Sequence, residues 1–299
     1  MLFGRKALAL CPILLGCLLA VAQQSGKGDQ WKAVDDAMGR PGQDQPDGAH
    51  KFGLPRGDLK VTVAGVEVKP TLALGSWVAF SKPGAGSMVM GDLVLAEEEV
   101  EPVMLSLENN GIQITAVHNH VLHESPRVMY MHIGGHGDAV KLASAIKEAV
   151  GLTKTPPPSP APSSPPEAGM DLDTSAIEQA LGHKGKINGG VFQVSVPRAE
   201  SIIEGGMKVP GSMGLATALN FQSTGGGKAA ITGDFVLIGT EVNPVIQALR
   251  SNGIEVTALH SHMLDEQPRL FFMHFWANDD AAKLAKGLRA ALDKTNSKK

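Results

Sequence analysis

The stretch GDLVLAEEEVEPVMLSLENNGIQITAVHNH, residues 91–120, returns later in the chain as GDFVLIGTEVNPVIQALRSNGIEVTALHSH, residues 233–262. The two stretches align without a gap, and a repeat of this length indicates a duplicated structural unit. The same spacing also pairs shorter motifs farther out, namely Pro55-Arg56 with Pro197-Arg198 and Lys141-Leu142 with Lys283-Leu284. The chain is therefore predicted to contain two copies of one domain.

The duplication also sets the domain boundaries. Repeat 1 is predicted to cover residues 31–152, and repeat 2 is predicted to cover residues 174–295. The segment between them, residues 153–173, contains TKTPPPSPAPSSPPEAG, whose prolines exclude helix and favour an extended, semi-rigid spacer. With 299 residues, of which 43% are hydrophobic and 19% charged, the chain has enough apolar material for two cores.

The hydrophobic pattern predicts the same elements in each repeat. In repeat 1 it predicts a strand at 88–95, a helix at 99–111, strands at 112–121 and 127–134, and a helix at 138–150. Gly111, and Gly253 in repeat 2, are placed to end a helix in the left-handed conformation. The order β-α-β-β-α is typical of a ferredoxin-like core. We therefore predict an α+β fold of two tandem repeats, each an antiparallel sheet with both helices on one face.

Histidine is concentrated in the predicted hairpin of each repeat. TAVHNHVLHESPRVMYMH, residues 115–132, holds four of the ten histidines, and TALHSHMLDEQPRLFFMH, residues 257–274, carries three more. Because side chains alternate between the faces of a strand, one face of each hairpin should carry three imidazoles. With the turn centred between the strands, the expected directly opposed pairs are His118 with His132, His120 with Tyr130, His260 with His274, and His262 with Phe272.

Three imidazoles on one face are typical of a transition-metal site, and zinc with one open coordination position is the first candidate. The candidate ligands are His118, His120, His132, His260, His262 and His274. Glu124 and Glu266, at equivalent turn positions, are candidates for a fourth ligand or for a general base. Arg127 and Arg269 are candidates for binding an anion such as a carboxylate or phosphate. The alternative is that the histidines form a polar face that packs against protein without an ion.

His123 and His136 lie close to the predicted hairpin of repeat 1 and have no histidine counterpart. They are replaced by Asp265 and Asn278 in repeat 2. His136 lies in the stretch IGGHGD, residues 133–138, whose backbone N–H groups offer an anion site. A turn that leads into a capped helix explains the segment more simply.

The N-terminus predicts export. Residues 1–22 resemble a secretory signal peptide, with two basic residues, an apolar run and a small-x-small cleavage site. The alternative is a lipoprotein box in which Cys17 receives a lipid anchor. No later segment approaches the roughly 18 consecutive apolar residues of a membrane span. The formal net charge of −3, without a basic patch, excludes a nucleic-acid partner.

Long motifs that match in order make the chain similar to the LppY/LpqO family of exported bacterial proteins. They are MVMGDLVL, NGI followed by the histidine pair, ESPRVMYMHIGGHGD and the later KLA. The resemblance covers both repeats and implies a periplasmic or extracellular protein, often a lipoprotein, with a repeated domain of unknown function. In repeat 2 the Gly-Gly-His-Gly motif is replaced, which makes repeat 1 the better candidate for the working site if that loop serves function.

These observations together predict an extracytoplasmic protein that binds a transition metal through duplicated histidine faces. Its partner would be a small molecule or a component of the cell envelope. Two alternatives stay open: a metal-dependent hydrolase with Glu124 or Glu266 as the base, and a non-catalytic structural or interaction module without metal. The sequence has no P-loop, nucleophile elbow or dinucleotide fingerprint, which disfavours nucleotide, covalent-hydrolase and NAD chemistry.

Overall fold

The computed structural model describes residues 1, 29–158 and 170–298. The predicted signal peptide and its Cys17 lie outside these residues, and so does the middle of the predicted proline-rich linker. In the described part of the chain, no helix combines the length and apolar character needed to cross a membrane.

Repeat 1 contains one six-stranded antiparallel sheet and three helices longer than one turn. Its helices are η1 (Asp29–Trp31), α1 (Lys32–Met38), α2 (Pro70–Ala73), η2 (Glu97–Glu99), α3 (Val100–Asn109) and α4 (Ala139–Val150). Its strands are β1 (Gln43–Asp44), β2 (His50–Pro55), β3 (Thr62–Val63), β4 (Val66–Glu67), β5 (Gly75–Phe80), β6 (Ser87–Ala96), β7 (Gln113–His118), β8 (Glu124–Ser125) and β9 (Val128–Gly137).

Repeat 2 has the same plan. Its helices are α5 (Thr174–Leu181), α6 (Gly239–Ser251) and α7 (Ala281–Leu292). Its strands are β10 (Gly185–Asn188), β11 (Val191–Pro197), β12 (Ile203–Glu204), β13 (Met207–Lys208), β14 (Ala216–Gly225), β15 (Lys228–Ile238), β16 (Glu255–His260) and β17 (Leu270–Asp280).

The sheet order is the one expected for a split β-α-β unit. In repeat 1 the order is β1-β2-β5-β6-β9-β7, and in repeat 2 it is β10-β11-β14-β15-β17-β16. Strand β9 lies between β6 and β7 and is antiparallel to both, so β6 and β7 run parallel and α3 connects them. The predicted α+β class with two tandem repeats is confirmed. Strands β1, β2 and β5 extend the sheet beyond the three strands that were predicted at 88–95, 112–121 and 127–134.

Local sequence signals explain where the helices begin and end. The Asp138 carboxylate accepts hydrogen bonds from the backbone N–H groups of Val140 and Lys141 and so caps α4. The predicted helix cap at the end of IGGHGD is thereby confirmed, but the predicted turn is wrong, because β9 continues as far as Gly137. Gly111 and Gly253 have φ values of 73° and 74°, which confirms the predicted left-handed ends of α3 and α6.

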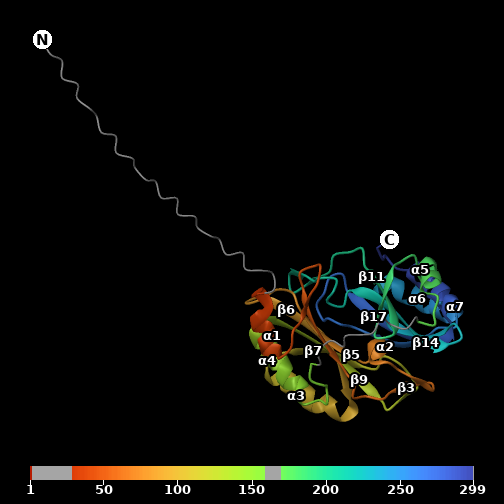
Figure 1. Cartoon of the computed structure of the whole chain (residues 1–299), viewed down its shortest axis with the longest axis horizontal. Coiled ribbons are helices and arrows are strands. Elements are labelled where there is room, and N and C mark those ends of the chain that lie inside the picture. The colour runs from red at the N-terminus through yellow and green to blue at the C-terminus, as the bar shows by residue number, and fades with distance from the viewer. Residues whose placement is uncertain (2–28, 159–169, 299) are drawn as a thin grey trace.

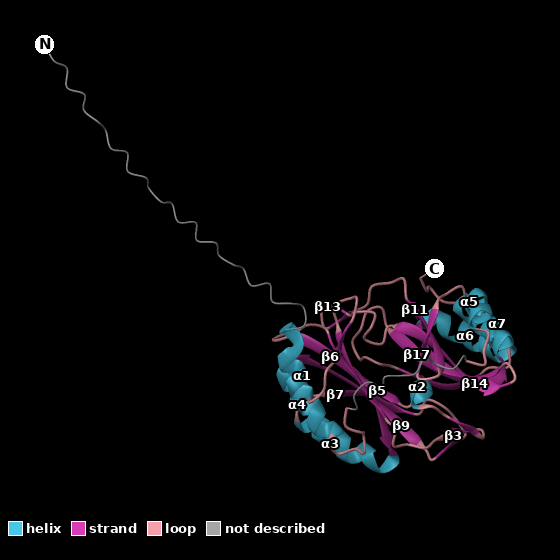
Figure 2. Cartoon of the chain, in the orientation of Figure 1, coloured by secondary structure: helices cyan, strands magenta, loops and turns pink. Residues whose placement is uncertain are grey.

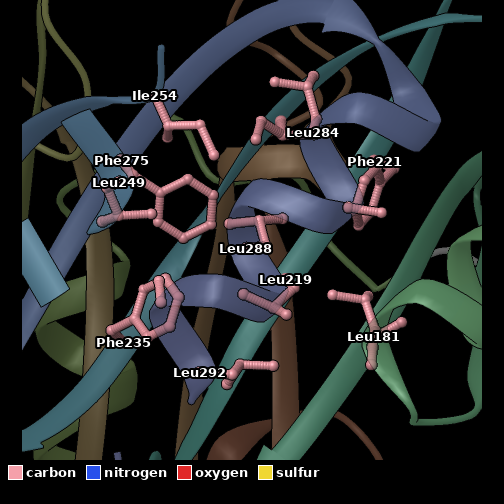
Figure 3. Close-up of a cluster of buried hydrophobic side chains, with 14 of the residues drawn as sticks. Leu181, Leu219, Phe221, Phe235, Leu249, Ile254, Phe275, Leu284, Leu288 and Leu292 are labelled. Carbon is pink, nitrogen blue, oxygen red and sulfur yellow. The ribbon is translucent and has the colours of Figure 1, made fainter. Parts of the chain in front are cut away.

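The two repeats pack sheet against sheet. Figures 1 and 2 show α1, α3 and α4 of repeat 1 on one side of the molecule and α5, α6 and α7 of repeat 2 on the other, with both sheets between them. Each sheet packs one face under its own helices. Figure 3 shows this core in repeat 2, where Phe235 and Phe275 of the sheet lie beside Leu284 and Leu288 of α7. The result is a four-layer arrangement of helices, sheet, sheet and helices.

The inner faces of the two sheets form a second, mixed layer. One apolar cluster in it joins Met88 and Met90 of β6 to Val236 and Phe272 of repeat 2. A second cluster joins Val94, Val121 and Tyr130 of repeat 1 to Ala230 and Trp276 of repeat 2. The face of each sheet that its own helices leave uncovered therefore packs against the other repeat. Between the two apolar clusters lie the histidines.

Candidate metal centre

The histidines of repeat 1 lie at the end of β7 and in the middle of β9. His118 is the last residue of β7, His120 follows two residues later, and His132 lies in β9. The observed pairing differs from the one that we expected: Ala116 lies opposite His132, and His118 lies opposite Tyr130.

Repeat 2 has the same register, with Ala258 opposite His274 and His260 opposite Phe272. The predicted direct opposition of the histidines is therefore wrong in both repeats, by two residues. Because side chains alternate with a period of two, a shift of two residues leaves every histidine on the predicted face. The three imidazoles of each repeat are diagonal neighbours rather than directly opposed pairs.

All six rings meet in one group, which we call the inter-repeat histidine cluster: His118, His120, His132, His260, His262 and His274. The ring centroids of His118 and His260, which are equivalent residues of the two repeats, lie 3.6 Å apart. The centroids of His120 and His274 are 3.8 Å apart, and those of His132 and His262 are also 3.8 Å apart. His120 corresponds to His262 and His132 corresponds to His274, so these two contacts are equivalent. The cluster therefore has pseudo-two-fold symmetry.

Hydrogen bonds between the repeats fix the strands that carry the histidines. The Thr115 hydroxyl donates to the backbone carbonyl of His262 at 2.8 Å, and the equivalent Thr257 hydroxyl donates to the carbonyl of His120 at 2.5 Å. The Asn119 amide donates to the carbonyl of Thr257 at 3.2 Å. The loop after each histidine strand is therefore held by the facing repeat, and the two halves of the cluster are positioned together.

Two carboxylates that the sequence analysis missed also belong to the site. Asp92 on β6 is the neighbour of His132 on β9, and its Oδ2 lies 3.5 Å from Nε2 of His120. Asp234 on β15 is its counterpart, with Oδ2 3.1 Å from Nε2 of His262. Both belong to the duplicated Gly-Asp pair inside an otherwise apolar strand. A charge at the centre of a buried strand, present in both copies, was the signal that could have identified them.

Many nitrogen and oxygen atoms of the cluster lack a hydrogen-bond partner in the protein. Eight such buried atoms belong to it: Asp92 Oδ1, His118 Nε2, His120 Nε2, His132 Nε2, Asp234 Oδ1, His260 Nδ1, His262 Nδ1 and His274 Nε2. Each unpaired buried polar group costs about 1–3 kcal/mol of stability. Such a concentration of unpaired polar atoms on histidine and aspartate side chains is the pattern expected at a site that binds a cation.

Two of the rings have their tautomer fixed by the backbone. Nδ1 of His118 lies 2.8 Å from the carbonyl oxygen of Asn119, and Nδ1 of His274 lies 2.6 Å from that of Gly233. A carbonyl only accepts, so Nδ1 carries the proton in both rings and Nε2 keeps its lone pair. Backbone contacts of this kind orient histidine ligands in metal sites.

Three overlapping groups of histidines have ligand atoms within 4.8 Å of one another. They are His118 with His260 and His274, His118 with His120 and His132, and His132 with His260 and His262. Two of the three groups combine both repeats. Any two groups share one histidine. Two groups could bind an ion at the same time only if one imidazole bridged both ions. The geometry therefore fits one ion per chain.

Burial keeps His120, His132, His262 and His274 neutral. Desolvation lowers the pKa of His120, His132 and His274 well below the ordinary value, and neighbouring histidines lower it further. Burial likewise lowers the pKa of His262 to about 3. Burial raises the pKa of Asp234 to about 6, although the nearby histidines oppose this shift. Neutral imidazole is the form that binds a metal ion.

Three of the predicted residues, Glu124, Glu266 and Arg269, contact their own loops. Glu124 accepts a hydrogen bond from the backbone N–H of Val128, and Glu266 accepts one from Leu270. Arg269 donates to the carbonyl of Leu264 and forms an ion pair with Glu266 at 3.3 Å.

Arg127 is exposed, and the described contacts join none of these four residues to a histidine of the cluster. His123 is exposed near Glu255, with Nε2 3.7 Å from its Oε1, and His136 lies on the outer part of β9.

Comparison with known proteins gives one family match. A family model described as Domain of Unknown Function (DUF1259) matches residues 32–152 and 175–294. Curated proteins give no match. A trimeric bacterial microcompartment shell protein, PduB, is 13% identical, with 85% of this chain and 89% of that chain covered and a TM-score of 0.21. EtuB from Clostridium kluyveri is 9% identical, with 84% and 90% covered and a TM-score of 0.19. These two structural likenesses are too weak to inform fold or function.

Proposed function

The chain belongs to the family described as Domain of Unknown Function (DUF1259), through both of its repeats, and we propose that its function is to bind one transition-metal ion between them. The site is the inter-repeat histidine cluster together with Asp92 and Asp234. In this proposal the duplication serves to bring two halves of one site face to face.

The observation that carries the proposal is the set of eight buried polar atoms without a partner. Apolar residues would fill the same space at lower cost, since a buried polar group needs compensation. Coordination to a cation would satisfy several of these lone pairs at once. The neutral state of His120, His132, His262 and His274 supports the same conclusion, because protonated imidazoles do not bind metal.

The ligand set favours a borderline transition metal. Imidazole nitrogen suits zinc, copper, iron and nickel, whereas calcium and magnesium take oxygen ligands. Zinc, the ion that the sequence predicts, is bound by three histidines with a carboxylate or water as the fourth ligand. Asp92 or Asp234 would supply that carboxylate, since each lies beside histidines of its own repeat.

Elemental analysis of the untagged, purified protein tests the proposal. We expect about one equivalent of transition metal per chain, or the uptake of one equivalent after dialysis against metal. The variants His118→Ala and His260→Ala should both reduce metal content, although they alter different repeats. His183→Ala is the matched control, because His183 follows α5 in the outer helix layer and belongs to none of the ligand groups.

A structural role without metal is the second candidate. The close stacking of equivalent rings, such as His118 on His260 at 3.6 Å, favours it. In that case the protein would stay metal-free after dialysis. The same histidine variants would then lower the free energy of unfolding equally with and without added metal.

Hydrolysis is a further prediction that needs a base next to the metal. Glu124 and Glu266 were the candidates from sequence, and their described contacts are with the backbone of their own loops. Asp92 and Asp234 are the carboxylates nearer to the histidines, so Asp92→Asn and Asp234→Asn would be the more informative variants in a hydrolase screen. Export, a lipid anchor at Cys17 and membership of the LppY/LpqO family also stay predictions.

A further inference from the structure

A small pocket opens beside the inter-repeat histidine cluster. Strands β6, β7 and β9 of repeat 1 contribute to its wall, and so do β12 and the loop after β16 of repeat 2. Three methionines line it, Met88, Met90 and Met263, and each is at most 4% exposed. His262 of the cluster lines it as well. The pocket therefore brings thioether groups next to an imidazole of the candidate site.

The residues that line the pocket differ in their exposure to solvent. His136 is exposed and lies against the turn between β12 and β13, where a Cβ on Gly205 would be 3.0 Å from its Nε2. Glu204 on β12 is half-buried, and its Oε2 has no hydrogen-bond partner in the protein. The methionines and His262 are buried. A cation that enters here would meet the Glu204 carboxylate and the His136 imidazole first, and the methionine sulfur atoms and His262 behind them.

The pseudo-symmetric side of the molecule is built differently. The counterparts of Met88, Met90 and Met263 are Ala230, Thr232 and Val121. The counterpart of Gly134, which also lines the pocket, is Trp276. Trp276 is 6% exposed and packs in one apolar cluster with Val121 and Ala230. The fold thus packs this region without methionine, and a tryptophan occupies the side where repeat 1 has a glycine.

We propose that this methionine-lined pocket is the entrance through which copper(I) reaches the histidine cluster. The proposal rests on the metal-binding function proposed above and names the ion. Thioether sulfur is a soft ligand that selects copper(I), whereas imidazole alone suits zinc and copper equally. The methionines would bind the ion transiently, and His262 would be the first imidazole of the inter-repeat histidine cluster to receive it.

The pocket also accounts for features of repeat 1 that the metal cluster leaves unexplained. His136 and the glycines around it distinguish the first copy from the second. Gly134 leaves space that a side chain would fill, and His136 provides a nitrogen ligand at the mouth. The Gly-Gly-His-Gly motif is thereby assigned to the entrance rather than to the ligand set of the cluster.

Loading kinetics of the full chain test this assignment. Metal-free protein is mixed with copper(I), supplied as its acetonitrile complex under anaerobic conditions, or with Zn²⁺, and uptake is followed by competition with a coloured chelator. The test variant combines Met88→Leu, Met90→Leu and Met263→Leu, because leucine keeps the volume and removes the sulfur. The matched control is Met213→Leu. Met213 is fully buried in the same mixed layer and is not part of the pocket wall.

We expect the triple variant to take up copper(I) roughly tenfold more slowly or worse, with zinc uptake unchanged. Met213→Leu should behave as the wild type with both ions. Gly134→Trp, which copies Trp276, should slow the uptake of both ions because it fills the entrance.

Two results would overturn the assignment, and they can be told apart. Equal copper(I) uptake by the wild type and the triple variant would refute the entrance and leave the cluster as a metal site. Failure of the wild type to take up either ion would remove the proposed function itself, and the entrance with it.

Discussion

Glu124 is a half-buried carboxyl in the loop between the histidine strands. Burial raises its pKa to about 7, although the backbone N–H of Val128 and the charge of Arg127 oppose the shift. Its ordinary pKa is 4.5, so the folded protein keeps a proton between these pH values that the unfolded chain releases. The contribution of Glu124 to stability is therefore fully present below pH 4.5 and is lost as the pH rises through about 7.

The variant Glu124→Gln tests this assignment, because glutamine does not titrate. Denaturant unfolding of metal-free protein between about pH 5 and pH 8 should show a difference between wild type and variant that changes in favour of the variant as the pH rises. The histidines titrate in both proteins, so their contribution cancels in the difference. A pH-independent difference would show that the Glu124 pKa is close to its ordinary value.

Single residues show what a sequence can and cannot predict here. Alternation along β7 and β9 was enough to predict that His118, His120 and His132 share one face. It was not enough to predict the pairing, because the connection between β7 and β9, residues 119–127, sets it and places Ala116 rather than His118 opposite His132. The pairing that follows from such a long connection leaves no signal in the pattern of apolar residues.

Among the elements, the contact between β2 and the start of α3 is repeated in both halves. Arg56 at the end of β2 is fully buried and pairs with Glu99 at 2.6 Å and with Asp58 at 2.8 Å. Arg198 forms the equivalent pair with Glu241 at 2.7 Å. The repeated Pro-Arg motif in the sequence thus marks a buried ion pair that joins an outer strand to a helix.

We expect Arg56→Met to lower the free energy of unfolding by about 3–5 kcal/mol, because it leaves the buried Glu99 carboxylate without its cationic partner. The double variant Arg56→Met, Glu99→Met should recover most of this loss, since it removes both charges. Denaturant unfolding of the three proteins measures both effects. A double variant no more stable than the single one would mean that the arginine acts through packing alone.

The element order could be predicted because each element has a strong local signal. The Asp138 cap and the left-handed Gly111 are read directly from sequence, and both occur in the structure. The outer strands β1, β2 and β5 are not among the strands predicted from the sequence. Their two-residue and six-residue lengths and interrupting glycines give only a weak pattern.

For the whole molecule, the main result is that one site is made from two repeats. Periodicity predicts that a face is polar or apolar, but it carries no information about what covers that face. The sequence therefore allowed two separate three-histidine sites, and only the packing of sheet on sheet brings six rings together. For the same reason, the sequence could not decide between a metal site and a histidine face that packs against protein without an ion.

A site shared between the repeats should couple metal binding to overall stability. Metal that binds only the folded protein raises the free energy of unfolding by about 2.7 kcal/mol at a hundred times its dissociation constant. We expect this stabilisation in thermal or denaturant unfolding of the wild type. It should be lost in His260→Ala and retained in His183→Ala. Equal stabilisation of all three proteins would mean that the metal binds elsewhere.

The replacement of Gly134 by Trp276 has a consequence for how such a molecule can evolve. Two identical subunits would present the same pocket on both sides, because any substitution appears twice. Once the subunits are joined in one chain, each half accumulates its own substitutions. One half can then close its pocket while the other stays open, and the shared centre acquires a direction of access that a homodimer of the same fold is unable to have.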